Sequence, residues 1–102
     1  MTYLERIGAA IKARVPPDVL PDDDDVDGLF RIYALLARVK GEQVTAEDVH
    51  DAWALWMLGQ QRDHSSIRPF CDLDPSTRRE DLPFVDAIRS IGVELDSARG
   101  VP

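Results

Sequence analysis

The sequence has 102 residues, which is the size of one domain with one modest hydrophobic core. Its hydrophobic fraction of 44% and charged fraction of 30% are ordinary for a soluble globular protein. The formal net charge of −7 opposes binding to nucleic acid polymers and to anionic membranes, because both attract basic surfaces.

Two helices are predicted in the N-terminal part of the chain. The first spans about residues 3–15, where apolar side chains recur at helical spacing. Thr2 and Glu5 can form a capping box at its start, and two consecutive prolines follow its end. The second helix spans about residues 25–39 and also has an apolar face. We expect an N-terminal helical pair within residues 1–44.

A run of four aspartates, Asp22 to Asp25, precedes the second helix. Acidic side chains favour a helix N-terminus, where free N–H groups and the helix dipole attract negative charge. A calcium or magnesium site is the alternative. The run lacks the alternating oxygen ligands and the turn glycine of an EF-hand loop, so we favour the capping role.

The C-terminal part is predicted to contain one long helix, one short helical turn and a final helix. The long helix spans about residues 46–60 and starts after Thr45 as its cap. A short turn begins at Pro75. The final helix spans about residues 83–91 and ends at a glycine, and residues 93–95 can add a short strand.

The predicted fold is therefore mainly α, in a single domain that covers residues 1–102. We expect three long helices and one short helix, and we allow a small strand pair. The last residues, 97–102, are predicted to form a loose tail.

Rare side chains gather between residues 49 and 85. This segment contains both tryptophans, both histidines, the only cysteine and two of the three phenylalanines. A segment that serves mainly solubility would not concentrate such residues, so we expect the functional site here.

His50, Trp53 and Trp56 lie three residues apart on the long helix and therefore share one face. One interpretation places the indoles in the core and has the imidazole donate a hydrogen bond to a loop carbonyl. The other interpretation makes this face a wall of a ligand pocket. Two indoles in so small a core leave room for one of them at a pocket edge.

Two arginines flank the loop that follows this helix. Arg62 and Arg68 can each present a planar donor fork to a phosphate or carboxylate, although a solvated surface arginine is the default. Arg68 is the first choice, because it stands next to Pro69 and the aromatic Phe70. The complete set of candidate ligand-binding residues is His50, Trp53, Trp56, Arg62, His64, Arg68 and Phe70.

Catalysis and metal binding find little support in the sequence. Asp63 and His64 are neighbours, but no nucleophile with the context of a catalytic elbow follows them. His50, His64 and Cys71 lack the paired spacing of zinc ligands, and Cys71 is expected to be a small buried side chain. We therefore predict no catalytic residue, no bound metal and no cofactor.

The single cysteine indicates the cellular compartment in which the protein is expected. One cysteine cannot form an internal disulfide, and a reducing cytosol is the simplest environment for such a chain. The first residues lack the pattern of a signal peptide, and no apolar run approaches the roughly 20 residues of a membrane span. A cytoplasmic location is expected.

The segment from about residue 49 to residue 95 resembles the RyR domain, a module named for ryanodine receptors that also occurs in bacterial and phage proteins. The resemblance starts with His50 and Trp53 on one helix, followed by His64 in a loop. It continues through the runs Arg68-Pro69-Phe70-Cys71-Asp72-Leu73 and Asp81-Leu82-Pro83-Phe84-Val85. Phe70 replaces the usual tyrosine and Leu82 the usual arginine. Residues 45–96 would form the RyR-like segment, with the N-terminal helical pair as an addition.

The resemblance implies binding rather than chemistry. It suggests a non-enzymatic module that senses or sequesters a nucleotide-derived signal, with rings from Trp53 and Phe70 and donors from His50 and Arg68. The alternative is a protein–protein interaction module with an aromatic patch and no small ligand. A homo-oligomer is compatible with both, because small binders often build pockets between subunits.

Overall fold

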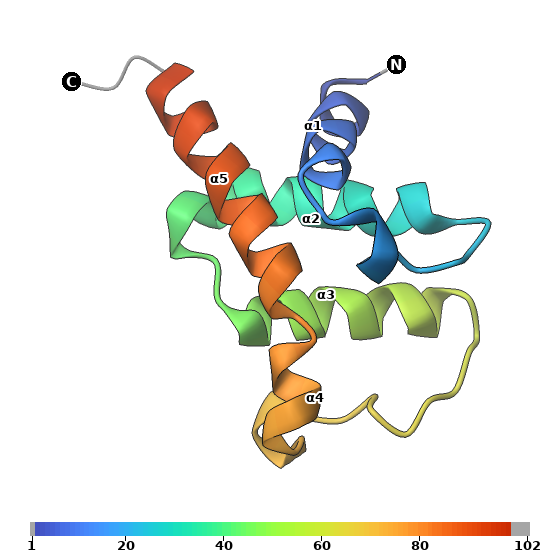
Figure 1. The fold of residues 1–102 in the computed structure, drawn as a ribbon. Coiled ribbons are helices and arrows are strands. Elements are labelled where there is room, and N and C mark those ends of the chain that lie inside the picture. The colour runs from blue at the N-terminus through green and yellow to red at the C-terminus, as the bar shows by residue number, and fades with distance from the viewer. Residues whose placement is uncertain (1, 99–102) are drawn as a thin grey trace.

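The helices predicted from apolar periodicity are present, and the connection from α3 to α4 is a long loop (Figure 1). The computed structural model describes residues 2–98, which contain four α-helices of 11 to 17 residues, one α-helix of five residues and no strand. The α-helices are α1 (Tyr3–Ala13), α2 (Val26–Lys40), α3 (Ala46–Gly59), α4 (Pro75–Arg79) and α5 (Leu82–Ala98). Three short 3-10 helices are η1 (Pro17–Val19), η2 (Gly41–Gln43) and η3 (Phe70–Asp72). The mainly α prediction is confirmed, whereas the small strand pair is absent from residues 2–98.

Side-chain caps set the beginnings of α1 and α3. The Thr2 hydroxyl accepts the N–H of Glu5 at 3.2 Å, and the Glu5 carboxylate accepts the N–H of Thr2 at 3.2 Å. Thr45 and Asp48 make the same reciprocal pair at α3, with distances of 3.2 and 2.9 Å. Both capping boxes satisfy N–H groups that the first turn of a helix leaves without an internal partner.

The hydrophobic core is built around α2, which contacts α1, α3 and α5. Leu29, Phe30 and Tyr33 on α2 are almost completely buried. They meet Ile11 from α1 and Ile88 from α5, which are also fully buried. Side chains from all four long helices therefore share one core, and α1 and α2 are part of it.

The last helix is longer than its sequence predicted. We expected it to end before Gly92 and residues 93–95 to be extended, but α5 continues to Ala98. Gly92 does not stop the helix. It lets α5 approach Gly41 of η2, because a Cβ at Gly92 would lie only 2.5 Å from the Gly41 carbonyl carbon. Gly41 itself has a φ of +57°, a conformation that favours glycine.

The predicted loose tail, residues 97–102, falls partly on this helix. Residues 97 and 98 belong to α5, and residues 99–102 lie outside the described residues. α5 thus makes a fourth long helix where three were expected. Within residues 2–98, no helix combines the length and the apolar character needed to cross a bilayer.

Candidate functional site

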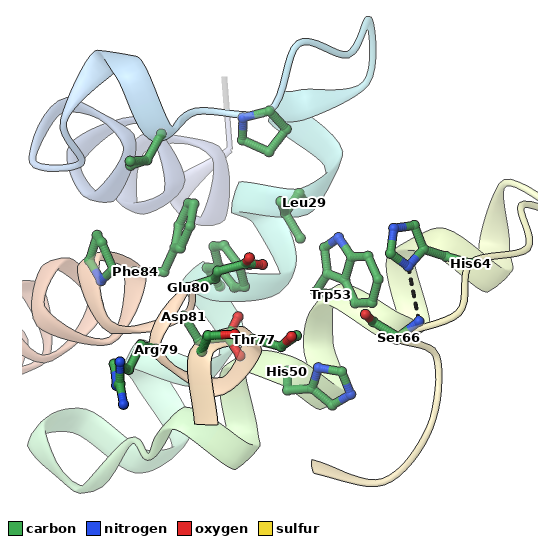
Figure 2. Close-up of a pocket in the computed structure, with 15 residues that line it drawn as sticks. Leu29, His50, Trp53, His64, Ser66, Thr77, Arg79, Glu80, Asp81 and Phe84 are labelled. Atoms are coloured by element: carbon green, nitrogen blue, oxygen red, sulfur yellow. Dashed lines mark hydrogen bonds between the residues drawn. The ribbon is translucent and has the colours of Figure 1, made fainter. Parts of the chain in front are cut away.

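A pocket of about 580 Å³ opens between α2, α3 and the turn from α4 to α5 (Figure 2). This volume lies in the range of small-molecule sites. Side chains from five parts of the chain line it. They are Val19, Pro21, Leu29, Tyr33, His50, Trp53, His64, Ser66, Ser76, Thr77, Arg79, Glu80, Asp81, Pro83 and Phe84.

The floor of the pocket consists of Leu29, Tyr33 and Phe84, which belong to the hydrophobic core. The rings of Tyr33 and Phe84 lie 5.8 Å apart between centroids and are tilted by 46°. Core packing fixes the rotamers of such residues. We therefore expect the floor to be rigid in the absence of any ligand.

The aromatic wall of the pocket consists of His50, Trp53 and His64. The Trp53 ring contacts both imidazoles, at centroid distances of 5.7 Å from His50 and 5.3 Å from His64. His50 is only 3% exposed, and its Nε2 lies 2.7 Å from the Arg68 carbonyl oxygen. His64 Nδ1 accepts the N–H of Ser66 at 3.0 Å, as Figure 2 shows. Each imidazole is thus oriented by a backbone group, and both hold Trp53 at the pocket.

The turn from α4 to α5 supplies the polar side of the pocket. The Asp74 carboxylate caps α4 by accepting the N–H of Thr77 at 2.8 Å, which places Thr77, Glu80 and Asp81 around the same opening as Trp53 (Figure 2). We call Glu80 and Asp81 the acidic edge. Burial raises the pKa of Asp81 from its ordinary value of 3.8 to about 6, with His50 lowering it and Glu80 raising it to smaller extents.

Trp56 on α3 and Arg62 in the loop after α3 lie outside the pocket lining and contact the segment that leads into α2. Trp56 is 6% exposed, and its indole N–H points at the Asp25 carboxylate, 3.1 Å away. Arg62 forms an ion pair with Asp23, and its guanidinium lies 6.0 Å from the centre of the Trp56 ring. These contacts hold the C-terminal end of α3 and the loop after it against the start of α2.

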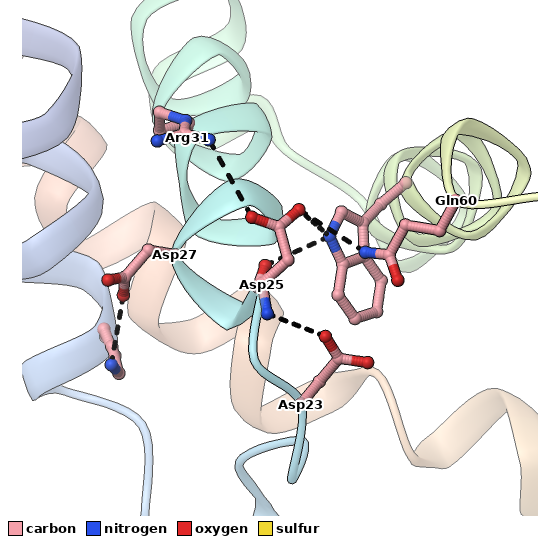
Figure 3. A network of polar contacts seen from close by, with 7 residues as sticks. Asp23, Asp25, Asp27, Arg31 and Gln60 are labelled. Carbon is pink, nitrogen blue, oxygen red and sulfur yellow. Dashed lines mark hydrogen bonds and ion pairs between the residues drawn. The ribbon is translucent and has the colours of Figure 1, made fainter.

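These contacts also show the role of the aspartate run from Asp22 to Asp25. Asp25 is the N-cap residue of α2 by position, but its side chain makes no capping bond. It accepts hydrogen bonds from the Trp56 indole and the Gln60 amide instead (Figure 3). The Asp23 carboxylate accepts the N–H of Asp25 at 2.8 Å. Between residues 2 and 98, no group of three or more His, Cys, Asp or Glu side chains is placed to hold a metal ion.

Arg68 and Phe70 lie near His50 but do not line the pocket. Arg68 is exposed, and its Nε donates to the Ser65 carbonyl at 3.1 Å. Phe70 is half-buried, with its ring 6.0 Å from the His50 ring and 5.5 Å from the Arg78 guanidinium. Cys71 was expected to be buried, but it is exposed, because Phe70 is the η3 residue that faces the His50 ring.

The sequence-based candidates are therefore divided by the fold. His50, Trp53 and His64 come together at the pocket, whereas Trp56, Arg62, Arg68 and Phe70 do not line it. Tyr33, Phe84 and the acidic edge were not among the candidates. Tyr33 and Phe84 follow the apolar period of their helices and looked like core residues, and no sequence signal separates a core face from a pocket floor.

A model of the family DUF7701, described as a domain of unknown function, matches residues 2–92. The chain belongs to this family. No curated protein and no solved structure gives a match.

The family match corrects the resemblance to the RyR domain. It covers nearly all of the segment on which that resemblance rested, and nothing in the comparisons indicates a RyR domain. The elements that suggested it have local causes in this fold: His50 and Trp53 are one helical turn apart, and Pro83 stands in the first turn of α5. Since the match begins at residue 2, α1 and α2 are parts of the family domain rather than an addition.

Proposed function

We propose that this member of the DUF7701 family is a non-enzymatic binding module for a small molecule, and that the pocket beside Trp53 is its binding site. The observation that carries the proposal is the combination of an apolar floor that belongs to the core, an aromatic wall and polar groups around one opening of about 580 Å³. Small-molecule sites are concave and mostly apolar, with a few convergent polar groups.

The aromatic wall favours a ligand with a flat ring. Stacking of a base on an aromatic side chain contributes about 1–3 kcal/mol in nucleic acid systems. Burial of the ring against Leu29 and Phe84 adds a hydrophobic contribution at about 25 cal/mol per Å². Because the floor is rigid before binding, little ordering opposes these contributions, and micromolar affinity is a reasonable expectation.

A nucleotide-derived ligand remains part of the proposal, with its base rather than its phosphate in the pocket. The two arginines expected to receive a phosphate do not line this pocket. Arg62 pairs with Asp23, and Arg68 donates to a loop carbonyl. A nucleoside-like ring against Trp53 fits the lining better than a phosphate does.

We place this function in the cytoplasm. Cys71 is an exposed free cysteine, and such a thiol persists most easily in a reducing compartment. We propose binding without chemistry because both histidines of the aromatic wall form hydrogen bonds with backbone groups. Among residues 2–98, neither histidine forms a hydrogen bond with a hydroxyl group that it could activate as a nucleophile.

The test uses the two tryptophans as separate reporters. Each indole N–H gives its own signal in a ¹H–¹⁵N NMR spectrum, and a ligand panel of nucleosides, cyclic nucleotides and ADP-ribose derivatives is titrated into the protein. A ligand in the pocket shifts the Trp53 signal in a saturable way and leaves the Trp56 signal in place. Thr77→Phe, which fills the opening, abolishes the shift, whereas Ser97→Phe at the exposed end of α5 does not.

A panel that never moves the Trp53 signal contradicts the proposal. Saturable shifts of equal size in Thr77→Phe would contradict the assigned site. Conversion of a panel compound to product in the same mixtures would contradict the absence of catalysis.

A second candidate function is protein–protein interaction through the outer face of α3. Leu55 and Leu58 lie three residues apart on this helix and are 61% and 58% exposed. Exposed apolar side chains on one helical face are typical of interaction surfaces. Concentration-dependent sedimentation that Leu55→Glu abolishes, together with a silent ligand panel, would favour this candidate and a homo-oligomer.

A further inference from the structure

The acidic edge contains two carboxylates that form no ion pair with the described residues, although His50 lowers the pKa of Asp81 to a small extent. Among residues 2–98, no side chain forms an ion pair or a hydrogen bond with the carboxylate of Asp81 or Glu80. Asp81 is half-buried and lines the pocket. A half-buried carboxylate without a hydrogen-bond partner is costly in the free protein, and a cationic donor in the pocket would offset that cost.

Tyr33 presents a second polar group without a partner. Its side chain is 1% exposed, and no residue between 2 and 98 forms a hydrogen bond with its hydroxyl. Every fully enclosed side-chain nitrogen or oxygen in the same residues does have a hydrogen-bond partner. The Tyr33 hydroxyl is therefore not fully enclosed, and since Tyr33 lines the pocket, its hydroxyl opens into it. Burial first, and the Asp81 carboxylate second, raise the pKa of Tyr33.

The rings around this opening favour positive charge as well. Tyr33, Trp53 and Phe84 all line the pocket, and a cation over an aromatic face is stabilised by about 0.5–2 kcal/mol. The same faces stack on a flat ligand. Aromatic faces beside an unneutralised carboxylate make a setting that suits an organic cation.

The basic side chains nearby do not reverse this charge balance. Arg78 donates to the carbonyls of Phe70 and Cys71, so it is occupied by backbone. Arg79 is the one cationic side chain among the described lining residues, against the two carboxylates of the acidic edge. A phosphate site would show the opposite balance, with arginine forks aimed inward.

We propose that the pocket selects a planar organic cation, such as an amidinium or a protonated amino-heterocycle, whose N–H groups reach Asp81 and Tyr33 while its ring lies against Trp53. This inference rests on the proposed function, because it names the class of ligand for the same site. An amidinium has two parallel N–H donors, which match the two oxygens of one carboxylate.

The test compares three probes of nearly equal size and shape. Benzamidine is cationic, benzamide is neutral and benzoate is anionic. Each is titrated against the wild-type protein while the Trp53 indole signal is followed, with the Trp56 signal as internal control. We expect benzamidine to bind at least tenfold more tightly than benzamide, and benzoate to cause no shift of the Trp53 signal.

Matched variants then locate the selectivity. Asp81→Asn should bring benzamidine and benzamide to within about threefold of each other while both still shift the Trp53 signal. Asp86→Asn, which removes an exposed carboxylate five residues further along the chain, on α5, should retain the preference for benzamidine. Circular dichroism confirms that both variants are folded.

The possible results distinguish a failure of cation selection from a failure of small-molecule binding. If benzamide or benzoate binds as tightly as benzamidine, cation selection is overturned while small-molecule binding at Trp53 stands. The same holds if nucleosides shift the Trp53 signal and none of the three probes does. Tighter binding of N-acetyl-arginine methylamide than of benzamidine would overturn the choice of a planar small molecule in favour of a basic side chain of a protein. If no compound shifts the signal, both proposals fail.

Discussion

The substitution Asp81→Asn should stabilise the free protein at neutral pH. Burial raises the pKa of Asp81 to about 6, so the folded state holds the proton more tightly than the unfolded state does. At pH 7 the carboxylate is mostly ionised, and the folded protein carries a half-buried charge without a partner. Asparagine has nearly the same shape and no charge. The Asp81 side chain forms no hydrogen bond within residues 2–98, and the N–H groups of Phe84 and Val85 are accepted by its backbone carbonyl, which the substitution keeps.

The size of the effect follows from the shift in pKa. The difference between 3.8 and about 6 corresponds to a ceiling of about 3 kcal/mol, at about 1.4 kcal/mol for each pKa unit. Water still reaches part of the side chain, which screens the penalty, so we expect a gain of about 1 to 2 kcal/mol. For a domain of this size, that gain raises the Tm by roughly 4–12 °C.

The pH dependence has a definite sign. A carboxyl group with a raised pKa in the folded state contributes its full stability below its unfolded pKa of 3.8, and this contribution is lost as the pH rises to about 6. The benefit of Asp81→Asn therefore should be small at pH 4, grow between pH 4 and pH 6 and stay constant above pH 7. The charged and titratable groups that face Asp81 are His50 from α3, Tyr33 from α2, and Arg79 and Glu80 from its own turn.

Thermal unfolding followed by circular dichroism at pH 4, 5, 6, 7 and 8 measures this prediction. Asp86→Asn is the control, because it removes the same charge from an exposed position and should change stability by less than about 0.5 kcal/mol. A variant Asp81→Asn that is less stable than the wild type at pH 7, or that gains equally at pH 4 and pH 7, would refute the reasoning.

Three further changes test the packing of the fold by urea denaturation. Gly92→Ala should destabilise the protein by more than about 2 kcal/mol, because its Cβ would lie 2.5 Å from a backbone carbonyl carbon, whereas Gly59→Ala has nothing within 4 Å and should not destabilise. Equal effects of the two substitutions would contradict the close contact of α5. Trp56→Phe should cost about 2 kcal/mol, since it leaves the acceptors at the start of α2 without the indole N–H, and a loss below about 0.5 kcal/mol would speak against that network. Thr45→Ala should cost about 1 kcal/mol by removing one capping box, and an unchanged midpoint would show that the box contributes nothing.

Local signals predicted the helices well, because caps and apolar periodicity act within a few residues. Thr2 and Thr45 begin their helices as expected. The end of α5 could not be predicted in this way. Gly92 is a normal stop signal in a sequence, and only the approach of the distant η2 explains why the helix continues through it.

The pocket residues were predictable only in part, because some of them are distant in the sequence and meet only in the folded chain. His50, Trp53 and His64 are rare residues close together in the sequence, and that concentration marked them. Tyr33 and Asp81 are 48 positions apart and reach the same pocket only because α2 and α5 pack together. The preference for Arg68 rested on its aromatic neighbour, and nothing in the sequence showed that its guanidinium would be turned toward a loop carbonyl.

The glycine contact between α5 and η2 also ties the shape of the pocket to a distant point. α5 carries Phe84 near one end and Gly92 further along, and Asp81 precedes its first turn. At 1.5 Å per residue, Asp81 and Gly92 are about 16 Å apart along the helix axis. A bulkier residue at Gly92 would push α5 away from η2, so a substitution that no ligand touches would displace Asp81 and Phe84 at the pocket.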